Sequence, residues 1–320
     1  MTKVIDQKEG KNWKLYHGDA VEVVQGLPDN SIGFTIFSPA FASLYTYSNS
    51  DRDMGNTKND GEFHAHFGFI VEQLYRVTKP GREVAFHCMN IPAMKERDGF
   101  IGLKDFRGDL IRAFQMRGFI FHSEHCIWKD PLIEATRTKA LGLMHKQLCK
   151  DSAMCRAGIP DYLVAMRKPG ENPEPVAHEC GLSWFHGDDP PHVKDGVLSH
   201  NIWRRYASPV WMDIRQSHTL NKNKARDERD EKHICPLQLD VIARGLTLWS
   251  NPGDVILSPF CGIGSEGYQA VKMGRRFLGV ELKYSYYREA CHYLKSAEES
   301  QNEMLELCES ENDFEEEAME

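Results

Sequence analysis

Three glycines and one glutamate near the C-terminal end have the types and spacing of a nucleotide-binding loop. Segment 254–270, DVILSPFCGIGSEGYQA, spells G-x-G-x-x-G at Gly262, Gly264 and Gly267, between an apolar stretch typical of a strand and a helical pattern. Glycines at a strand tip let the backbone approach a ligand closely. The next strand ends in Glu281, whose carboxylate can accept both hydroxyls of a ribose. Together these features predict a site for a nucleoside-containing cofactor.

A second motif follows the strand predicted at 32–37. Ser38-Pro39-Ala40-Phe41 resembles the [Asp/Asn/Ser]-Pro-Pro-[Tyr/Phe/Trp] motif of the DNA methyltransferases that make N4-methylcytosine or N6-methyladenine. The resemblance implies that Ser38 and the Pro39 carbonyl accept hydrogen bonds from an exocyclic amino group, and that Phe41 stacks on a base taken out of the duplex. Ala40 replaces the usual second proline. This replacement should make the turn less rigid, and it affects a group that takes part in the reaction less.

The resemblance to this family covers residues 13 to 295. The catalytic motif comes first, a variable insert second and the glycine loop last, which is the order of the β class, and phage and prophage methylases are similar to this chain. The resemblance implies S-adenosylmethionine as methyl donor. Ser258 stands where the family usually has Asp. The implied cofactor-binding residues are Asp19 facing the adenine, Pro259, Phe260, Gly262 and Gly264 along the loop, and Glu281 on the ribose.

Other enzyme classes fit the sequence less well. A nicotinamide oxidoreductase also uses a glycine loop and an acid at a strand end, but it normally carries them early in the domain and has no use for S-P-A-F. Methylation of cytosine C5 needs a cysteine nucleophile, typically in a Pro-Cys dipeptide, and none of the 15 prolines precedes a cysteine. RNA or protein amino-methylation uses similar motifs; the large insert and the β-class order favour DNA.

Two questions stay open at this level. Ser38 at the first motif position is commoner among N4-cytosine enzymes, which favours cytosine over adenine as the target. The substitutions Ala40 and Ser258 leave a catalytically silent cofactor- or DNA-binding homologue as the alternative from a different class.

Composition indicates the charge of the folded part, the state of the cysteines and the expected location of the protein. The formal net charge of -8 is misleading, because residues 298–320 hold 11 acidic side chains and no Lys or Arg, and the rest of the 320-residue chain carries +3. The nine cysteines form no C-x-x-C pair, which predicts reduced thiols and no metal. No apolar run is long enough to cross a membrane and the start is polar, so we expect a cytoplasmic protein of a bacterial host or a phage-infected cell.

Periodicity predicts alternating strands and helices, hence an α/β fold with a doubly wound sheet. The family resemblance implies a Rossmann-like, S-adenosylmethionine-dependent methyltransferase fold, with a mixed, mostly parallel sheet flanked by helices. The predicted strands are 13–19, which ends in a Gly-Asp turn, 32–37, 83–88, 119–128, 162–168, 254–260 and 275–282. The predicted helices are 20–30, 63–80, 104–117, 237–249, 265–274 and 285–299.

Four parts follow from this pattern. Residues 13–170 form the catalytic part, 171–232 a target-recognition insert outside the sheet, 233–295 the cofactor-binding part and 296–320 a disordered acidic tail. A polar loop at 42–61 is expected to cover the site. The expected partner is double-stranded DNA, with no membrane, a homodimer left open and no restriction partner required. Side chains of the insert that could contact DNA or belong to a local core are Arg204, Arg205, Lys222, Lys224, Arg226, Arg229, Trp184, Trp203 and Trp211.

Overall fold

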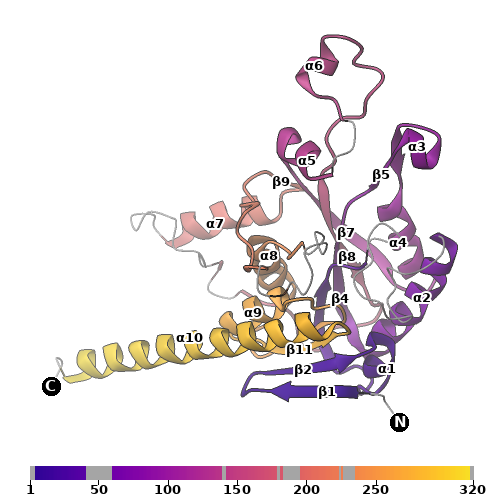
Figure 1. The fold of residues 1–320 in the computed structure, drawn as a ribbon. Helices are drawn as coiled ribbons and strands as arrows, with labels where there is room; N and C mark the ends of the chain where they lie inside the picture. Colours follow the sequence, from indigo (N-terminus) through magenta and orange to yellow (C-terminus); the bar gives the residue numbers. More distant parts are fainter. Residues whose placement is uncertain are drawn as a thin grey trace.

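One large sheet forms the centre of the molecule (Figure 1). The computed structural model describes residues 4–40, 60–138, 142–178, 181–182, 195–222, 225 and 235–317. Along the sheet the strands are β1 (Val4–Glu9), β2 (Trp13–Gly18), β11 (Arg276–Glu281), β10 (Val255–Ser258), β3 (Ile32–Phe37), β4 (Thr78–Cys88), β8 (Asp161–Arg167), β7 (Ile120–Ile127) and β9 (Val210–Trp211). Five neighbouring pairs are parallel and three antiparallel, which confirms the predicted mixed, mostly parallel sheet.

Helices cover both faces of the sheet. One face carries α1 (Ala20–Gln25), α2 (Asp60–Val77) and α4 (Phe106–Gln115), and the other carries α8 (Leu239–Trp249), α9 (Ser265–Lys272) and α10 (Tyr284–Glu317). The remaining elements are β5 (Ile91–Ala93), α3 (Lys95–Asp98), β6 (Gly102–Lys104), α5 (Pro131–Thr138), α6 (His145–Leu148) and α7 (Asp195–Tyr206). In the described part of the chain, no helix has the length and apolarity needed to span a bilayer.

The sequence of the central strand explains its position. All six residues of β3, IGFTIF, are buried, because helices pack on both faces of a strand in the middle of such a sheet. Phe34 and Ile36 point to the face of α8, α9 and α10, whereas Phe37 belongs to the core under α1, α2 and α4. The residue after Phe37 therefore returns to the α8 side.

Two element boundaries differ from the sequence prediction. The turn expected at residues 79–81 does not separate helix from strand, because α2 ends at Val77 and β4 begins at Thr78, so the turn lies within the start of β4. The predicted helix at 104–117 begins later, at Phe106, because the Asp105 side chain accepts a hydrogen bond from a backbone amide of the first turn.

The prediction that residues 171–232 lie outside the sheet is wrong at Val210–Trp211. Strand β9 pairs in parallel with β7, and Trp211 is 1% exposed and stacks on His125 with ring centroids 4.3 Å apart. Arg215 donates hydrogen bonds to Asp240 at the start of α8. The segment therefore contributes a strand and core residues to the domain, because its apolar side chains are needed to cover this end of the sheet.

Both ends of the chain extend the domain beyond its predicted limits. Strand β1 precedes residue 13 and pairs antiparallel with β2. A disordered tail was predicted for 296–320, but within the described residues α10 continues as a helix to Glu317 and extends away from the sheet (Figure 1). Its middle is still held by packing, since Ala297 is fully buried and the Glu298 carboxylate accepts a hydrogen bond of 2.8 Å from the Asn12 amide.

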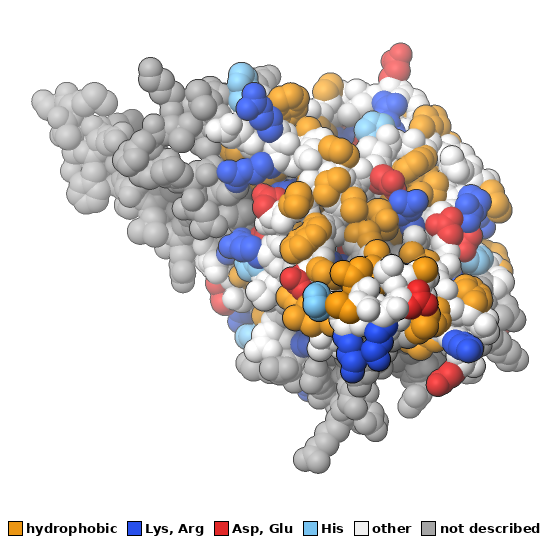
Figure 2. Space-filling view, turned by 90° about the horizontal axis from the view of Figure 1, so that it is seen from above, with side chains coloured by type: hydrophobic (Ala, Val, Ile, Leu, Met, Phe, Trp, Pro, Cys, Tyr) orange, Lys and Arg blue, Asp and Glu red, His pale blue; other side chains and the backbone are white. Residues whose placement is uncertain are grey.

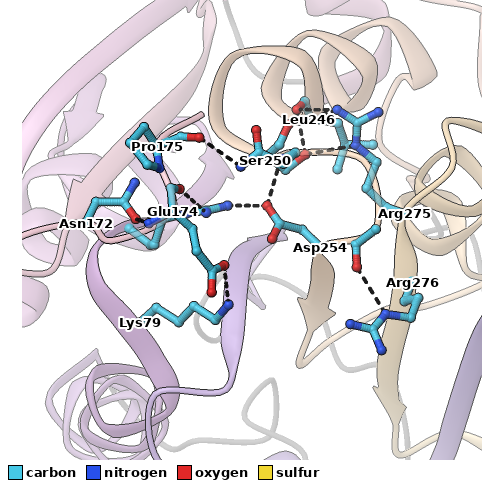
Figure 3. A network of polar contacts seen from close by, with 12 residues as sticks. Lys79, Asn172, Glu174, Pro175, Leu246, Ser250, Asp254, Arg275 and Arg276 are labelled. Carbon is cyan, nitrogen blue, oxygen red and sulfur yellow. Dashed lines mark hydrogen bonds and ion pairs between the residues drawn. The ribbon is translucent and has the colours of Figure 1, made fainter. Parts of the chain in front are cut away.

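A polar network at the amino edge of the sheet joins the catalytic part to the cofactor-binding part (Figure 3). Arg82 of β4 forms a buried ion pair with Asp254, which directly precedes β10. The same guanidinium donates to the carbonyl oxygen of Glu174, and the Glu174 carboxylate pairs with Lys79 at 2.6 Å. This edge has a structural role, which leaves the opposite, carboxyl edge for function.

Candidate active site

The S-P-A-F tetrapeptide, predicted to be catalytic, begins at the carboxyl end of β3, in the middle of the sheet. Ser38 is half-buried, Pro39 is buried, and Ala40 packs against the core under α1, α2 and α4. Phe41 lies outside the described residues, as does most of the loop expected at 42–61. The structure thus places three of the four predicted catalytic residues at one strand tip.

A chain of polar contacts runs from Ser38 into the protein. Its hydroxyl is hydrogen-bonded to Nδ1 of His87 at 3.1 Å, because β3 and β4 are parallel and in register, with Phe37 beside Phe86. His87 Nε2 lies 3.3 Å from a carboxylate oxygen of Asp161, the first residue of β8. The other oxygen of Asp161 forms an ion pair with Lys129.

The charge of Asp161 is set by these partners. Burial alone would raise the pKa of this carboxyl, but His87 and Lys129 outweigh that effect and lower the pKa to about 2. Asp161 is therefore ionised at neutral pH although it is 5% exposed.

The glycine loop lies beside the catalytic motif, at the tip of β10. Gly262 and Gly264 have φ values of 53° and 88°, in the left-handed region that favours glycine. A Cβ atom on Gly262 would meet nothing within 4 Å, which leaves room for a ligand, whereas one on Gly264 would lie 3.1 Å from Ala290 of α10. Gly262 therefore suits close approach of a cofactor, and Gly264 serves packing.

Glu281 fastens this loop to the neighbouring strand. One carboxylate oxygen accepts a hydrogen bond of 2.9 Å from the Gly262 amide, and the other accepts one of 2.8 Å from the Lys283 amide. Each carboxylate oxygen has a second lone pair, so the group can hold the loop and still accept ligand hydroxyls.

Asp19 lies next along the same edge. Strands β2 and β11 are parallel, with His17 beside Glu281, so Asp19 follows directly. Its side chain accepts a hydrogen bond of 3.1 Å from the Glu22 amide and caps α1. The predicted cofactor residues thus line the tips of β10, β11 and β2 in a row.

Two side chains in the loop region bear on the fit of a cofactor. Ser258 is fully buried, and its hydroxyl has no hydrogen-bond partner among the described residues. Glu266, 4% exposed in the first turn of α9, has its pKa raised to about 8 by burial and by the nearby Glu281 carboxylate. A ligand with a polar, cationic end fits this set, because it would satisfy both groups.

The catalytic motif and the glycine loop touch each other. Leu257 of β10 pairs in parallel with Thr35 of β3, and the rings of Phe37 and Phe260 lie 5.7 Å apart. Pro259, between Ser258 and Phe260, is buried. Segments more than 200 residues apart in the chain therefore form one continuous site.

Sequence reasoning missed four residues of this site: His87, Asp161, Lys129 and Glu266. The ends of neighbouring parallel strands meet at one edge, so the histidine near the end of EVAFHC was a detectable signal. The register that brings Asp161 and Lys129 to it depends on antiparallel pairing of β4 with β8, which the sequence does not reveal.

The end of the molecule that carries α6 in Figure 1 has an unusual surface. Figure 2 shows hydrophobic side chains gathered there, with both basic and acidic side chains between and around them. In α5, α6 and the adjoining segments, the exposed large apolar side chains are Trp128, Leu132, Ile133, Leu148 and Met154.

Comparison with known proteins supports the interpretation of this site. A family model described as DNA methylase, of the N6/N4 type, matches residues 37–292. This chain belongs to that DNA methylase family. The match spans the S-P-A-F motif, the glycine loop and Glu281. The predicted class of amino-methyltransferase is thereby confirmed, and S-adenosylmethionine is the cofactor of this class.

Curated relatives of this methylase are type II methyltransferases. It is 23% identical over 296 residues to M.BglII of Bacillus subtilis, a match that covers 92% of this chain and 72% of that protein. It is 22% identical over 276 residues to M.BamHI of Bacillus amyloliquefaciens, which covers 84% of this chain and 54% of that protein.

Solved structures establish the fold of this methylase. A putative DNA modification methylase of Thermus thermophilus, complexed with S-adenosyl-L-methionine, superposes with a TM-score of 0.61 at 20% identity, covering 90% of this chain and 96% of that one. The cytosine-N4-specific PvuII DNA methyltransferase gives a TM-score of 0.59 at 15% identity, covering 93% and 94%. The predicted methyltransferase fold is confirmed.

Proposed function

We propose that this methylase transfers a methyl group from S-adenosylmethionine to the exocyclic amino group of a base taken out of double-stranded DNA, with N4 of cytosine as the favoured target. The observation that carries the proposal is the contact between the two motifs. Ser38 and the glycine loop occupy neighbouring strand tips, with Phe37 and Phe260 in ring contact between them. A target amino group and a methyl donor can therefore be held side by side.

Residues of the cofactor side have separate tasks in this proposal. Glu281 accepts hydrogen bonds from the ribose hydroxyls while it holds the loop. Gly262 has no side chain, so the backbone of the loop can lie close to the ligand. Asp19 faces the adenine, and Phe260 lies between cofactor and catalytic strand. Glu266 supports binding of a cationic end group, because a nearby positive charge would favour the ionised form of this buried carboxyl.

S-adenosylmethionine supplies an electrophilic methyl group on its sulfonium. The amino nitrogen of a base is conjugated and poorly nucleophilic, so the protein must orient its lone pair. Ser38 and the Pro39 carbonyl accept hydrogen bonds from the amino group, and Phe41 stacks on the base. Transfer is direct and in line, without a covalent enzyme intermediate, so positioning is the main contribution of the protein.

We place the DNA over the surface shown in Figure 2. Trp203 is 57% exposed on α7 and is followed by the exposed Arg204, and Lys146 and Lys150 are exposed around α6. Cations that meet phosphates and aromatic side chains that stack on bases are the usual components of such an interface. Trp211 is excluded from base stacking because it is buried in the core. Trp184, Lys224, Arg226 and Arg229 lie outside the described residues.

The choice of cytosine over adenine rests on Ser38 and on family resemblance. The test is to incubate the purified protein with labelled S-adenosylmethionine and unmodified duplex DNA, digest the DNA to nucleosides and identify the product by mass spectrometry. N4-methylcytosine supports the full proposal, and N6-methyladenine corrects only the base. Cofactor binding without any methylated nucleoside would contradict it and favour the silent homologue suggested by Ala40 and Ser258.

A further inference from the structure

The catalytic serine is the end of a buried chain of polar groups that the S-P-A-F motif does not contain. Ser38, His87, Asp161 and Lys129 come from four separate segments, and they follow one another from the strand tip into the protein. His87 is 8% exposed and Asp161 is 5% exposed. Buried polar groups at such positions need a reason, because each must be desolvated.

The contacts of the chain favour one direction for the hydrogen bond between Ser38 and His87. Asp161 is ionised and can only accept, so the tautomer with a hydrogen on His87 Nε2, which lies 3.3 Å from the carboxylate without hydrogen-bond geometry, is the one that this contact favours. Its Nδ1 is then a lone-pair acceptor, and the Ser38 hydroxyl is the donor in the 3.1 Å contact. Ser38 has only one hydrogen. With that hydrogen committed to His87, the serine oxygen can offer only lone pairs to a substrate.

We propose that His87, held by Asp161 and Lys129, is a positioning residue for methyl transfer: it makes Ser38 an obligate acceptor and takes up the proton that the amino group releases. This inference rests on the proposed function and deepens it. A serine without this partner could turn its hydrogen toward the nitrogen lone pair, and that orientation would oppose the reaction.

The proton balance of the step is complete without further reactants. The lone pair of the amino nitrogen forms a bond to the methyl carbon while the carbon–sulfur bond breaks. The electron pair of the broken bond stays on sulfur, which becomes neutral. The nitrogen then carries a positive charge and gives one hydrogen to Ser38 as the serine hydrogen moves to His87 Nδ1. The resulting imidazolium faces the Asp161 carboxylate, which stabilises it, and later returns the proton to water.

Other charges around His87 have partners of their own. On the same face, His125 of β7 is hydrogen-bonded to the Ser208 carbonyl, and Arg244 of α8 pairs with Asp213. On the opposite face of β4 and β8, Arg107 pairs with Glu124 at 3.2 Å. Asp161 is therefore the charged group that contacts His87 directly, and Lys129 contacts Asp161 in turn.

The first test is the pH dependence of kcat. In the wild type, kcat should fall at acidic pH, because an imidazolium ring has no lone pair to accept the Ser38 hydrogen. Asp161→Asn should change this pH profile, because it removes the charge that lies next to His87 Nε2. His87→Asn keeps an acceptor for Ser38 but cannot titrate, so it should lose the acidic fall and reduce kcat about tenfold or more.

His125→Asn is the matched control, because this buried histidine lies on the same face of the sheet in register with His87 across β8. It should keep the wild-type pH profile. Profiles of Asp161→Asn and His87→Asn that coincide with the wild type would overturn the proposal, as would loss of the acidic fall in His125→Asn.

A second test needs no substitution. Side-chain ¹⁵N NMR of the wild-type protein should show neutral His87 with its hydrogen on Nε2, and the Nδ1–H form would overturn the proposal. This measurement also separates the two levels of inference. If the wild type methylates no DNA, the proposed function fails whatever the histidine form, whereas methylation of DNA with the Nδ1–H form refutes only the role of His87.

Discussion

The two sides of the carboxyl edge balance charge in opposite ways. On the catalytic side, Asp161 is paired with His87 and Lys129, and its pKa is lowered to about 2. On the cofactor side, Glu266 lies buried near Glu281, and its pKa is raised to about 8. The first group of charges is complete within the protein, whereas a cationic ligand beside the second would favour ionisation of the Glu266 carboxyl.

This difference matches the two ligands of the proposed reaction. S-adenosylmethionine is positively charged at its sulfonium and amino groups, so an anionic site favours its binding. The target base is neutral, and the catalytic side must orient hydrogen bonds without attracting charge. Each side can therefore be perturbed by itself, and substitutions should separate binding of the cofactor from the rate of transfer.

Glu281→Ala should have the largest effect. It removes the acceptor of two backbone amides and, in the proposed site, of the ribose hydroxyls, and hydrogen bonds to a charged group contribute about 1.5–3 kcal/mol each. The Kd for S-adenosylmethionine, measured by isothermal titration calorimetry, should rise about 100-fold or more. Glu72→Ala, an exposed glutamate on α2, is the control. An unchanged Kd in Glu281→Ala would refute the role of this carboxylate.

Ser38→Ala should have the next largest effect, on rate alone. Loss of one oriented acceptor should lower kcat about tenfold or more, since a hydrogen bond contributes about 1.4 kcal/mol when it forms only in the transition state. The Kd for the cofactor should not change. Ser31→Ala, before the start of β3, is the control. A parallel loss of cofactor affinity in Ser38→Ala would show that the two sides are not separable.

Glu266→Gln should change the pH dependence of stability. A carboxyl with a pKa of about 8 in the folded protein and an ordinary value near 4.5 in the unfolded chain binds more protons when folded. Stability of the ligand-free protein should therefore decline as pH rises from about 4.5 to about 8, and Glu266→Gln should flatten that decline. Each kcal/mol corresponds to about 2–4 °C in Tm for domains of somewhat smaller size.

Differential scanning fluorimetry at pH 6 and pH 8.5 measures this effect. Saturating S-adenosylmethionine should also reduce the pH dependence of the wild type, because a cation near Glu266 favours its ionised form. If the Tm of Glu266→Gln falls between these two pH values as steeply as that of the wild type, the buried Glu266 carboxyl is not the source of the pH dependence on the cofactor side.

Local sequence patterns located the loop of the cofactor side, although they did not single out Glu266. A strand, a glycine loop, a helix and a second strand ending in Glu281 follow one another within 30 residues, so periodicity and turn residues locate them together. The α/β alternation followed from the same local patterns, whereas the methyltransferase fold was implied by the family resemblance. Local patterns also misled at the C-terminal end, where the acidic composition of 296–320 indicated disorder but α10 continues.

The catalytic side could be predicted only in part. Ser38 was found because it belongs to a motif, but His87, Lys129 and Asp161 lie 49, 91 and 123 residues further along the chain. Their meeting depends on antiparallel pairing of β8 between β4 and β7, and strand register is set by long-range packing. For the same reason the sequence did not reveal that β9 joins the sheet.

Ala40→Pro should have the smallest effect and tests how rigid the catalytic turn is. Proline fixes φ and removes an amide hydrogen, and within the described residues the Ala40 amide donates no hydrogen bond that would be lost. Since Ala40 already packs against the core, the substitution should stabilise the turn by about 0.4–1 kcal/mol and raise kcat about twofold to fivefold, with no change in the cofactor Kd. Single-turnover kinetics measures the rate of transfer directly. A fall in the rate would mean that the turn needs a backbone conformation that proline cannot adopt, and that Ala40 is required by this chain for a competent catalytic side.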